Sequence, residues 1–353
     1  MKHILHVVGA RPNFVKAAPV LRAAKQCGIR QTLVHTGQHY DRNMSEVFFT
    51  QLEIPQPDVN LGVGSGSHAV QTAETMRRFE TVVLDRQPEI VLVYGDVNST
   101  VAAALVCAKL QIPIGHVEAG LRSFDRTMPE EINRIVTDQL SDLLFTPSED
   151  ADANLRQEGI AAEKIYRVGN VMIDSLVRFL PAARSCPRNG FPDRLALVTL
   201  HRPANVDDDV NLRQILDALS GMGERIEIVF PVHPRTRQRI AEFGIAAPTL
   251  HLVDPLPYID FLSLQARAAV VITDSGGIQE ETTYLGIPCI TLRKNTERPV
   301  TVTVGTNILV GDDGNRLAAE LNNILVGNAK KGTVPPLWDG HAGDRIADVL
   351  RGL

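Results

Sequence analysis

The sequence is poor in cysteine, and the few cysteines are scattered. Four occur in 353 residues, and none stands in a CxxC pair or another metal-ligand spacing, which argues against a zinc site. Three of them lie in apolar stretches, as reduced thiols of a protein core do: Cys27, Cys107 and Cys289. We therefore expect a cytoplasmic protein that needs no metal.

Long apolar runs and an excess of positive charge are also missing. No apolar stretch approaches the roughly 20 residues of a membrane-spanning helix, and the opening segment 1–8 is too short in apolar length for a signal peptide. The net charge is −5, so we expect neither a membrane nor a nucleic acid as partner. Local basic residues remain available for a small anionic ligand.

Strand and helix patterns alternate along the whole chain, which predicts an α/β fold with mostly parallel sheets. The first series of strands is expected at 4–8, 32–35, 90–94, 114–117 and 143–146. The second is expected at 195–200, 226–232, 250–253, 270–273 and 289–292. Helical patterns lie between the strands, at 14–26, 69–85, 99–109 and 130–141, and a last one covers 344–353.

Two domains follow from the length and from this repetition. The segment 181–193 contains Pro181, Pro187, Gly190 and Pro192 and is the best linker candidate. We predict domains at 1–184 and 185–353, with a C-terminal helix at about 340–353 packing back on the first. The predicted architecture is two doubly wound, Rossmann-like domains facing a cleft, as in the glycosyltransferase-B fold.

Polar segments follow the apolar runs in both halves. Because open α/β sheets bind ligands at the carboxyl ends of their strands, these segments predict one ligand held between the two domains. They are Gly9-Ala10-Arg11-Pro12, Gly95-Asp96-Val97-Asn98-Ser99-Thr100, His116-Val117-Glu118-Ala119-Gly120-Leu121-Arg122-Ser123, Leu200-His201-Arg202 and Asp274-Ser275-Gly276-Gly277-Ile278-Gln279-Glu280-Glu281.

The first segment is a strand-to-helix turn suited to an anion. The helix start offers free N–H groups, and Arg11 and Lys16 add cationic side chains, so a diphosphate fits this corner; a solvated loop with a surface lysine is the alternative. The glycine-rich run at 62–66 lacks the context of a dinucleotide fingerprint. We interpret it as a loop before a helix, and we expect no nicotinamide cofactor.

Three carboxylates are candidates for acid–base chemistry: Asp96, Glu118 and Glu130. Asp96 and Glu118 end consecutive strands, and crowded carboxylates raise the proton affinity of at least one member. Structural roles are also open to them. Asp96 is one of several possible caps of the helix that follows it. Either Glu130 or its neighbour Glu131 can favour the helix dipole, and Glu130 can pair with Arg134 four residues on.

The second half supplies histidines and an anion nest. His201 and His233 each follow a strand, and this repeated placement predicts ligand contact, although a lone histidine of this kind is usually structural. The segment 275–277 opens a helix, where backbone N–H groups and the Ser275 hydroxyl can surround an anion. Glu281 lies one turn further and can accept hydrogen bonds from ribose hydroxyls.

With these residues the chain resembles the non-hydrolysing UDP-N-acetylglucosamine 2-epimerases over nearly its whole length. The matching segments also include Gly37-Gln38-His39, Pro129-Glu130-Glu131-Ile132-Asn133-Arg134, Pro231-Val232-His233 and Thr296-Glu297-Arg298-Pro299. The resemblance implies interconversion of UDP-GlcNAc and UDP-ManNAc without metal or NAD. UDP is eliminated to give 2-acetamidoglucal and is added again after C2 has inverted. The implied assembly is a homodimer.

The resemblance also implies roles for single residues. It makes Asp96, Glu118 and Glu130 the catalytic carboxylates and places His201 near the diphosphate. It assigns the ribose to Glu281 and adds His233 and Arg298 to the substrate-binding candidates. The UDP site then comprises Arg11, Lys16, Arg134, Ser275, Gly276 and Gly277.

One residue departs from the pattern of the family. Family members that their substrate activates often carry Gln three residues after the Gln of the Gln-His pair, whereas this chain has Asp41, which puts such activation in question. A sister group that epimerises UDP-2,3-diacetamido-2,3-dideoxyglucuronate shares some of the matching segments. A UDP site between two such domains also suits a hydrolysing epimerase, a UDP-sugar glycosyltransferase or a non-catalytic nucleotide-sugar sensor.

Overall fold

The computed structural model describes residues 2–37, 51–187, 190–192 and 194–353, with no description of the Arg11 side chain. The segment Gln38-His39-Tyr40-Asp41, with its bearing on substrate activation, therefore lies outside the described residues. The chain forms two compact units. The first is Met1–Arg178 together with Pro336–Leu353, and the second is Phe179–Pro335. The predicted domain boundary at 184/185 stays a prediction.

The first unit contains a parallel sheet with the strand order β3-β2-β1-β4-β5-β6-β7. The strands are β1 His3–Val8, β2 Arg30–His35, β3 Val59–Asn60, β4 Ile90–Tyr94, β5 Ile114–Val117, β6 Leu143–Thr146 and β7 Ile165–Arg167. The central strands consist of buried residues throughout, because helices cover both faces of the sheet.

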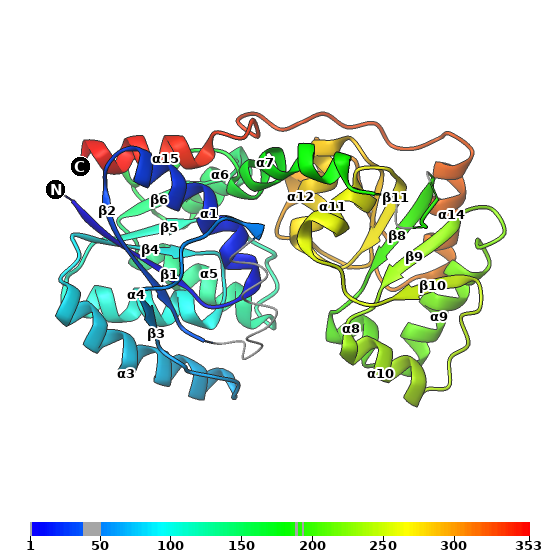
Figure 1. Cartoon of the computed structure of the whole chain (residues 1–353), viewed down its shortest axis with the longest axis horizontal. Coiled ribbons are helices and arrows are strands. Elements are labelled where there is room, and N and C mark those ends of the chain that lie inside the picture. Colours follow the sequence, from blue (N-terminus) through cyan, green and yellow to red (C-terminus); the bar gives the residue numbers. More distant parts are fainter. Residues whose placement is uncertain (1, 38–50, 188–189, 193) are drawn as a thin grey trace. The chain divides into compact units, whose positions relative to one another are not determined.

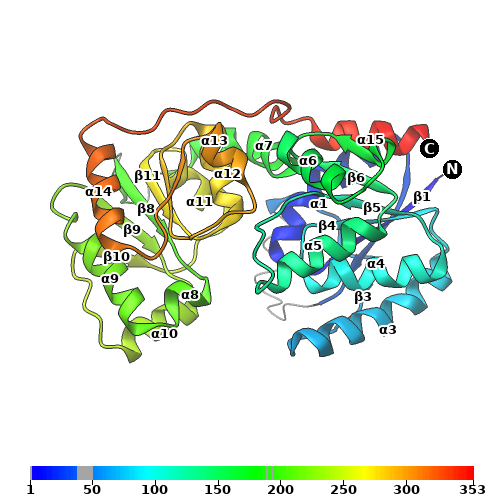
Figure 2. The same ribbon diagram turned by 180° about the vertical axis from the view of Figure 1, so that it is seen from behind.

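Two helical layers cover this sheet on opposite faces (Figure 1, Figure 2). One layer contains α3 His68–Arg86, α4 Asn98–Leu110 and α5 Pro129–Leu140, and the other contains α1 Arg11–Gln26 and the C-terminal helix α15 Ala342–Gly352. Among its described residues the unit also contains α6 Glu149–Gln157, the short η1 Ala162–Lys164 and the first half of α7 Val171–Ser185. The run at 62–66 is the predicted loop before a helix, although the short strand β3 precedes it.

The second unit repeats this plan with the strand order β10-β9-β8-β11-β12-β13. Its strands are β8 Leu195–Thr199, β9 Glu227–Pro231, β10 Leu250–Val253, β11 Ala268–Thr273, β12 Cys289–Thr291 and β13 Asn307–Leu309. Its helices are α8 Pro203–Val206, α9 Asp209–Ser220, α10 Pro234–Glu242, α11 Tyr258–Gln265, α12 Gly276–Leu285, α13 Pro299–Thr303 and α14 Gly314–Leu325. The predicted α/β class with two doubly wound, Rossmann-like units is confirmed.

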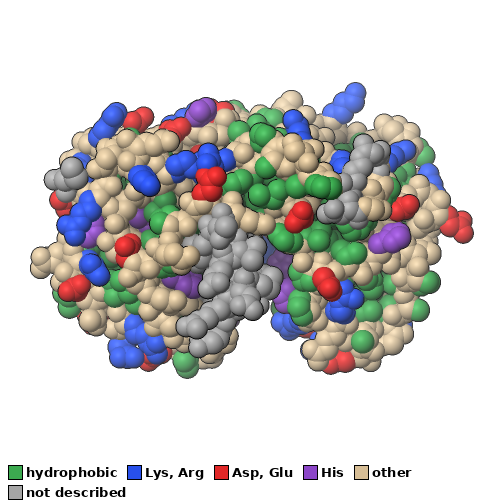
Figure 3. Space-filling model, viewed as in Figure 1, with side chains coloured by type: hydrophobic (Ala, Val, Ile, Leu, Met, Phe, Trp, Pro, Cys, Tyr) green, Lys and Arg blue, Asp and Glu red, His purple; other side chains and the backbone are tan. Residues whose placement is uncertain are grey.

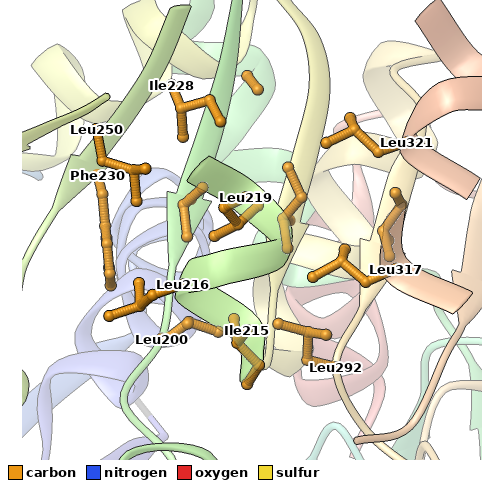
Figure 4. Close-up of a cluster of buried hydrophobic side chains, with 14 of the residues drawn as sticks. Leu200, Ile215, Leu216, Leu219, Ile228, Phe230, Leu250, Leu292, Leu317 and Leu321 are labelled. Atoms are coloured by element: carbon orange, nitrogen blue, oxygen red, sulfur yellow. The ribbon is translucent and has the colours of Figure 1, made fainter. Parts of the chain in front are cut away.

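The main core of the second unit lies where α9 and α14 meet one face of the sheet (Figure 4). Leu216 and Leu219 of α9, Leu317 of α14, and Ile228 and Phe230 of β9 are fully buried members of this core. Each fully buried apolar side chain of this size contributes roughly 1.5–3 kcal/mol. This core fixes the strand ends that carry the polar segments.

The predicted linker is wrong at its start. Helix α7 spans Val171–Ser185 and includes Pro181, so residues 181–185 are helical. A proline inside a helix removes one backbone hydrogen bond. Here the apolar residues Ile173, Leu176 and Ala183 are fully buried, and their burial outweighs that loss.

Candidate active site

The candidate residues of the first unit gather at the topological switch point of its sheet. Strands β1 and β4 are neighbours, and the chain leaves them toward opposite sides of the sheet; open α/β sheets bind ligands at such a point. The turn after β1 carries Gly9 and Ala10, and the turn after β4 carries Gly95 and Asp96. Asn13 joins the two turns, because its side chain accepts hydrogen bonds from the amides of Gly9 and Ala10 and donates one to the Tyr94 carbonyl.

Lys16 and Glu118 form a buried ion pair at this edge. Both side chains are almost inaccessible, and Lys16 reaches from α1 to the end of β5. Glu118 has a φ of 73°, a left-handed conformation that side chains other than glycine rarely adopt. Strained backbone of this kind clusters at functional sites. Because its side chain is buried and paired, the alternative interpretation of Lys16 as a solvated surface lysine is wrong.

Arg134 of α5 holds Asp96 from the other side. Its guanidinium forms an ion pair with the Asp96 carboxylate and a second one, at 2.6 Å, with Glu131. Glu131 also accepts hydrogen bonds from the Ser123 and Phe124 amides. Although burial raises it, the pKa of Glu131 lies below its usual range because of these donors and Arg134. Glu131 is thus the structural member of the Glu130–Glu131 pair.

Glu130 remains half-buried in the first turn of α5. Within the described part of the chain it makes no ion pair, so the alternative pairing of Glu130 with Arg134 is wrong. The capping alternative for Asp96 is also wrong, because α4 has Val97 as its N-cap and no side-chain cap hydrogen bond. The structural alternative that remains is the position of Glu130 in the first turn of α5, where it favours the helix dipole.

A second buried charge cluster, formed by His116, Arg122 and Asp138, contacts the Gly95–Asp96 turn. His116 contacts Asp138 through Nδ1 at 2.6 Å and the Gly95 carbonyl through Nε2 at 2.9 Å. Arg122 contacts the other Asp138 oxygen at 2.7 Å. Burial raises the pKa of Asp138, but His116 and Arg122 together bring it below its usual range. No local sequence pattern indicates this cluster, because its members lie in different elements.

The second unit presents its candidates at the equivalent switch point, between β8 and β11. His201 follows β8, and its Nδ1 lies 2.8 Å from Asp274, which follows β11. Asp274 is fully buried and accepts hydrogen bonds from the amides of His201 and Arg202. Burial raises the pKa of Asp274, yet His201 and the Arg202 amide hold it below its usual range. The His201 side chain itself is half exposed and carries an acidic partner.

Helix α12 begins directly after this pair. Ser275 is its N-cap and makes no side-chain cap hydrogen bond, so its hydroxyl adds to the free amides of the first turn. The Arg298 guanidinium lies against this helix start. It is so close to Gly276 that a Cβ added there would collide with it. Arg298 forms ion pairs with Glu280, at 2.9 Å, and with Glu297. A helix N-terminus with an adjacent guanidinium suits a phosphate.

Glu281 lies one turn into α12 and is buried. Burial raises its pKa to about 7. Its carboxylate accepts a hydrogen bond from the Tyr258 hydroxyl at 2.9 Å. His233, by contrast, is exposed and caps α10, with its Nδ1 accepting from the Arg235 amide at 3.3 Å. The structure thus gives His233 a structural role, and its ligand contact stays a prediction.

The charge and hydropathy of the described surface do not indicate a further binding site beside these two. On the face in Figure 3, Lys and Arg side chains are interspersed with Asp and Glu over each unit. Within the described ranges, no helix combines the length and the apolar character that crossing a bilayer requires.

Comparison with known proteins identifies the family of the chain. A family model described as UDP-N-acetylglucosamine 2-epimerase matches residues 22–351. The UDP-N-acetylglucosamine 2-epimerase of Methanocaldococcus jannaschii is 43% identical, covering 98% of this chain and 97% of the relative. The UDP-2,3-diacetamido-2,3-dideoxy-D-glucuronate 2-epimerase of Pseudomonas aeruginosa is 44% identical, with 99% of each chain covered. A crystal structure of the M. jannaschii enzyme in complex with UDP-GlcNAc and UDP superposes with a TM-score of 0.92, at 41% identity and 100% coverage of both chains.

Proposed function

Because the chain belongs to the UDP-N-acetylglucosamine 2-epimerase family, we propose that it interconverts UDP-GlcNAc and UDP-ManNAc without releasing free sugar. The observation that carries this proposal is the pairing of two carboxylates with buried cations at one sheet edge, Glu118 with Lys16 and Asp96 with Arg134. Carboxylates positioned beside a reacting carbon can take and give its proton.

The proposed reaction is an elimination followed by an addition. The C1–O bond to UDP breaks and its electron pair leaves with the UDP oxygen, while a carboxylate takes the C2 proton, which gives 2-acetamidoglucal and UDP. UDP then adds to C1 again, and a proton enters at C2 on the opposite face. We assign the removal and addition of the C2 proton to Asp96, Glu118 and Glu130. We assign to His201 the stabilisation of charge on the departing diphosphate.

The nucleotide is assigned mainly to the second unit. We propose that the start of α12 binds phosphate oxygens through Ser275, Gly276 and Gly277, aided by Arg298. Glu281 takes the ribose hydroxyls. The remaining substrate-binding candidates are Arg11, Lys16, Arg134 and His233. The free amides of α12 and the adjacent guanidinium support this assignment.

A second candidate substrate is UDP-2,3-diacetamido-2,3-dideoxyglucuronate. The 44% identity to a Pseudomonas aeruginosa enzyme named for that substrate favours it, because this identity and its coverage of 99% of each chain match or exceed those of the M. jannaschii relative. The two substrates share the UDP group and the reacting C2 carbon, so the same carboxylates serve either one.

Proton NMR in deuterated water distinguishes these functions. The protein is incubated separately with each UDP-sugar in the presence of EDTA. For the correct substrate we expect deuterium at C2, formation of the C2 epimer and no free sugar. Release of free ManNAc and UDP identifies a hydrolysing enzyme. Binding of UDP-GlcNAc without deuterium exchange in either sugar contradicts an epimerase.

We further propose a cytoplasmic homodimer. The four cysteines are free thiols, as a reducing compartment allows. Val70 and Leu84 on α3 are both more than half exposed, and we choose them as candidate contacts of this dimer. Light scattering coupled to size-exclusion chromatography tests the dimer, and Val70→Lys with Leu84→Lys is expected to give the monomer.

A further inference from the structure

The Glu281 carboxylate is held by one oxygen only. Tyr258, the first residue of α11, donates its hydroxyl to Glu281 Oε1 at 2.9 Å. The other oxygen, Oε2, is buried and has no hydrogen-bond partner among the described residues. A buried polar atom without a partner is unfavourable by about 1–3 kcal/mol, so its persistence points to a ligand that supplies a donor.

The ring of Tyr258 is fixed by an aromatic neighbour. Phe179 of α7 meets it edge to face, with ring centroids 6.2 Å apart and an angle of 89° between the planes. Edge-to-face contacts of this geometry restrict the rotation of both rings. The Tyr258 hydroxyl is therefore aimed at Glu281 before any ligand binds.

Charged and polar neighbours decide how readily Glu281 ionises. Burial is the largest influence and raises its pKa to about 7, and the negative charge of Glu280 acts in the same direction. Tyr258 and Gln265, both on α11, act in the opposite direction. Of these two, only Tyr258 donates a hydrogen bond to the carboxylate, because the Gln265 amide nitrogen has no partner within the described ranges. Arg298 pairs with Glu280 at 2.9 Å and offsets part of that negative charge.

We propose that Tyr258 is a positioning residue of the nucleotide site, which orients the Glu281 carboxylate so that Oε2 accepts a ribose hydroxyl of UDP. This inference rests on the proposed function, which assigns the ribose to Glu281. Tyr258 itself touches no substrate in this proposal. Its contribution is to substrate affinity and to the pH range in which that affinity is high.

Calorimetric titration with UDP between pH 5.5 and 9 tests this role. In the unaltered protein, affinity rises with pH through about 7, because the ionised Glu281 is the better acceptor. Tyr258→Phe removes the hydroxyl and keeps the ring. We expect its rise to move to higher pH, with binding roughly fivefold weaker at pH 7 and approaching tenfold weaker at lower pH for a shift of one pKa unit. In turnover assays KM for UDP-GlcNAc rises and kcat is unchanged.

Two further variants make the outcome specific. Glu281→Gln gives the baseline for the pH dependence of UDP affinity. It removes the titrating group at position 281 and leaves the titration of the UDP phosphate unchanged. Tyr284→Phe, on a half-buried tyrosine of the same helix, is the matched control and is expected to behave as the unaltered protein. Thermal melting confirms that each variant is folded.

The outcomes separate this inference from the function on which it rests. If Glu281→Gln binds UDP as tightly as the unaltered protein at every pH, the ribose assignment fails. If Glu281→Gln weakens binding but the Tyr258→Phe profile coincides with that of the unaltered protein, the ribose assignment stands and the role of Tyr258 is overturned. A shifted Tyr258→Phe profile supports both.

Discussion

At the scale of single residues, buried cations determine what the candidate carboxylates are able to do. Lys16 and Arg134 are each nearly inaccessible, and each is committed to a carboxylate of the first unit. Breaking such a buried pair by removing one partner leaves an uncompensated charge and is strongly destabilising. Informative substitutions therefore keep the shape of the side chain. Because Asp96→Asn and Glu118→Gln still remove the charge that faces Arg134 and Lys16, folding of each variant must be measured beside its activity.

Asp96→Asn, Glu118→Gln and Glu130→Gln are each expected to lower turnover by roughly 10²–10⁴-fold, the usual contribution of a positioned acid or base. The measurement is initial rate with UDP-GlcNAc, with circular dichroism to confirm folding. Glu149→Gln, on an exposed acid of α6, serves as control and keeps full activity. Turnover like that of the unaltered protein in all three variants would remove the acid–base cluster.

Gly95→Ala is expected to inactivate the protein because the site has no room for a side chain. Gly95 has a φ of 62°, and an added Cβ would lie 2.6 Å from Lys16 Nζ and 3.1 Å from Glu118 Oε2. The matched control is Gly159→Ala, at a φ of 83° with nothing within 4 Å of the new Cβ. Both changes strain the backbone by about 1 kcal/mol, so a difference in activity between them measures displacement of the Lys16–Glu118 pair. Equal activities would contradict the crowding argument.

The stability of the second unit is expected to depend on the proton of Glu281. Its pKa in the folded protein is raised to about 7 from an ordinary value of 4.5, so the folded state binds this proton more tightly than the unfolded state. The stabilisation is complete below about pH 4.5 and is lost as pH rises to about 7. Glu281→Gln removes this fall, which urea titrations at pH 5 and pH 8 detect as a smaller difference between the two midpoints. An undiminished difference would assign the fall to other groups.

At the scale of elements, both units build their candidate sites from the same arrangement of strand, turn and helix. A buried parallel strand ends in a polar turn, and a helix begins within a few residues. This occurs at β1–α1 and β4–α4 in the first unit and at β8–α8 and β11–α12 in the second. Because neighbouring strands at a switch point send their helices to opposite faces, the turns between them remain accessible to a ligand.

The C-terminal helix α15 is anchored to the first unit by one buried carboxylate. Asp174 of α7 accepts hydrogen bonds from the amides of Ala342, at 3.0 Å, and Gly343, at 2.7 Å, in the first turn of α15. Asp174→Ala is expected to release this helix start, because about 1.5–3 kcal/mol is lost for each hydrogen bond to a charged group. Hydrogen exchange of the α15 amides is the measurement, with at least a tenfold acceleration expected.

The control for this experiment is Asp348→Ala, on an exposed residue of α15 itself. Its amides are expected to exchange at the rate of the unaltered protein. Acceleration of the same size in both variants would show that general fraying of the helix, and not the Asp174 anchor, limits exchange.

At the scale of the whole molecule, the proposed function requires both units to act on one substrate. We predict that UDP-GlcNAc lowers the radius of gyration measured by small-angle X-ray scattering, because cations of the first unit and amides of the second would share one diphosphate, as in hinge closure around ligands. Uridine, which lacks the phosphates, serves as control and leaves the radius unchanged. An unchanged profile with saturating UDP-GlcNAc would contradict closure on the ligand.

The sequence by itself determined the α/β class and the position of most strands. The expected strands at 90–94, 114–117, 143–146 and 250–253 agree with β4, β5, β6 and β10 residue for residue. Strands buried on both faces are short apolar runs bounded by turn residues, so their limits are local information. The strands β3, β7 and β13 were missed, because two or three partly buried residues at or near a sheet edge carry little such pattern.

Only the tertiary structure decided which polar groups meet. Lys16 pairs with Glu118 across 102 positions of the chain, and Arg134 pairs with Asp96 across 38, whereas the local spacing had offered Arg134 to Glu130. Tyr258 reaches Glu281 from a different helix. Such contacts follow from strand order and from the crossing of helices over a sheet, which are set by the packing of the whole core. Periodicity in the sequence shows which face of an element is buried, but not which partner it is buried against.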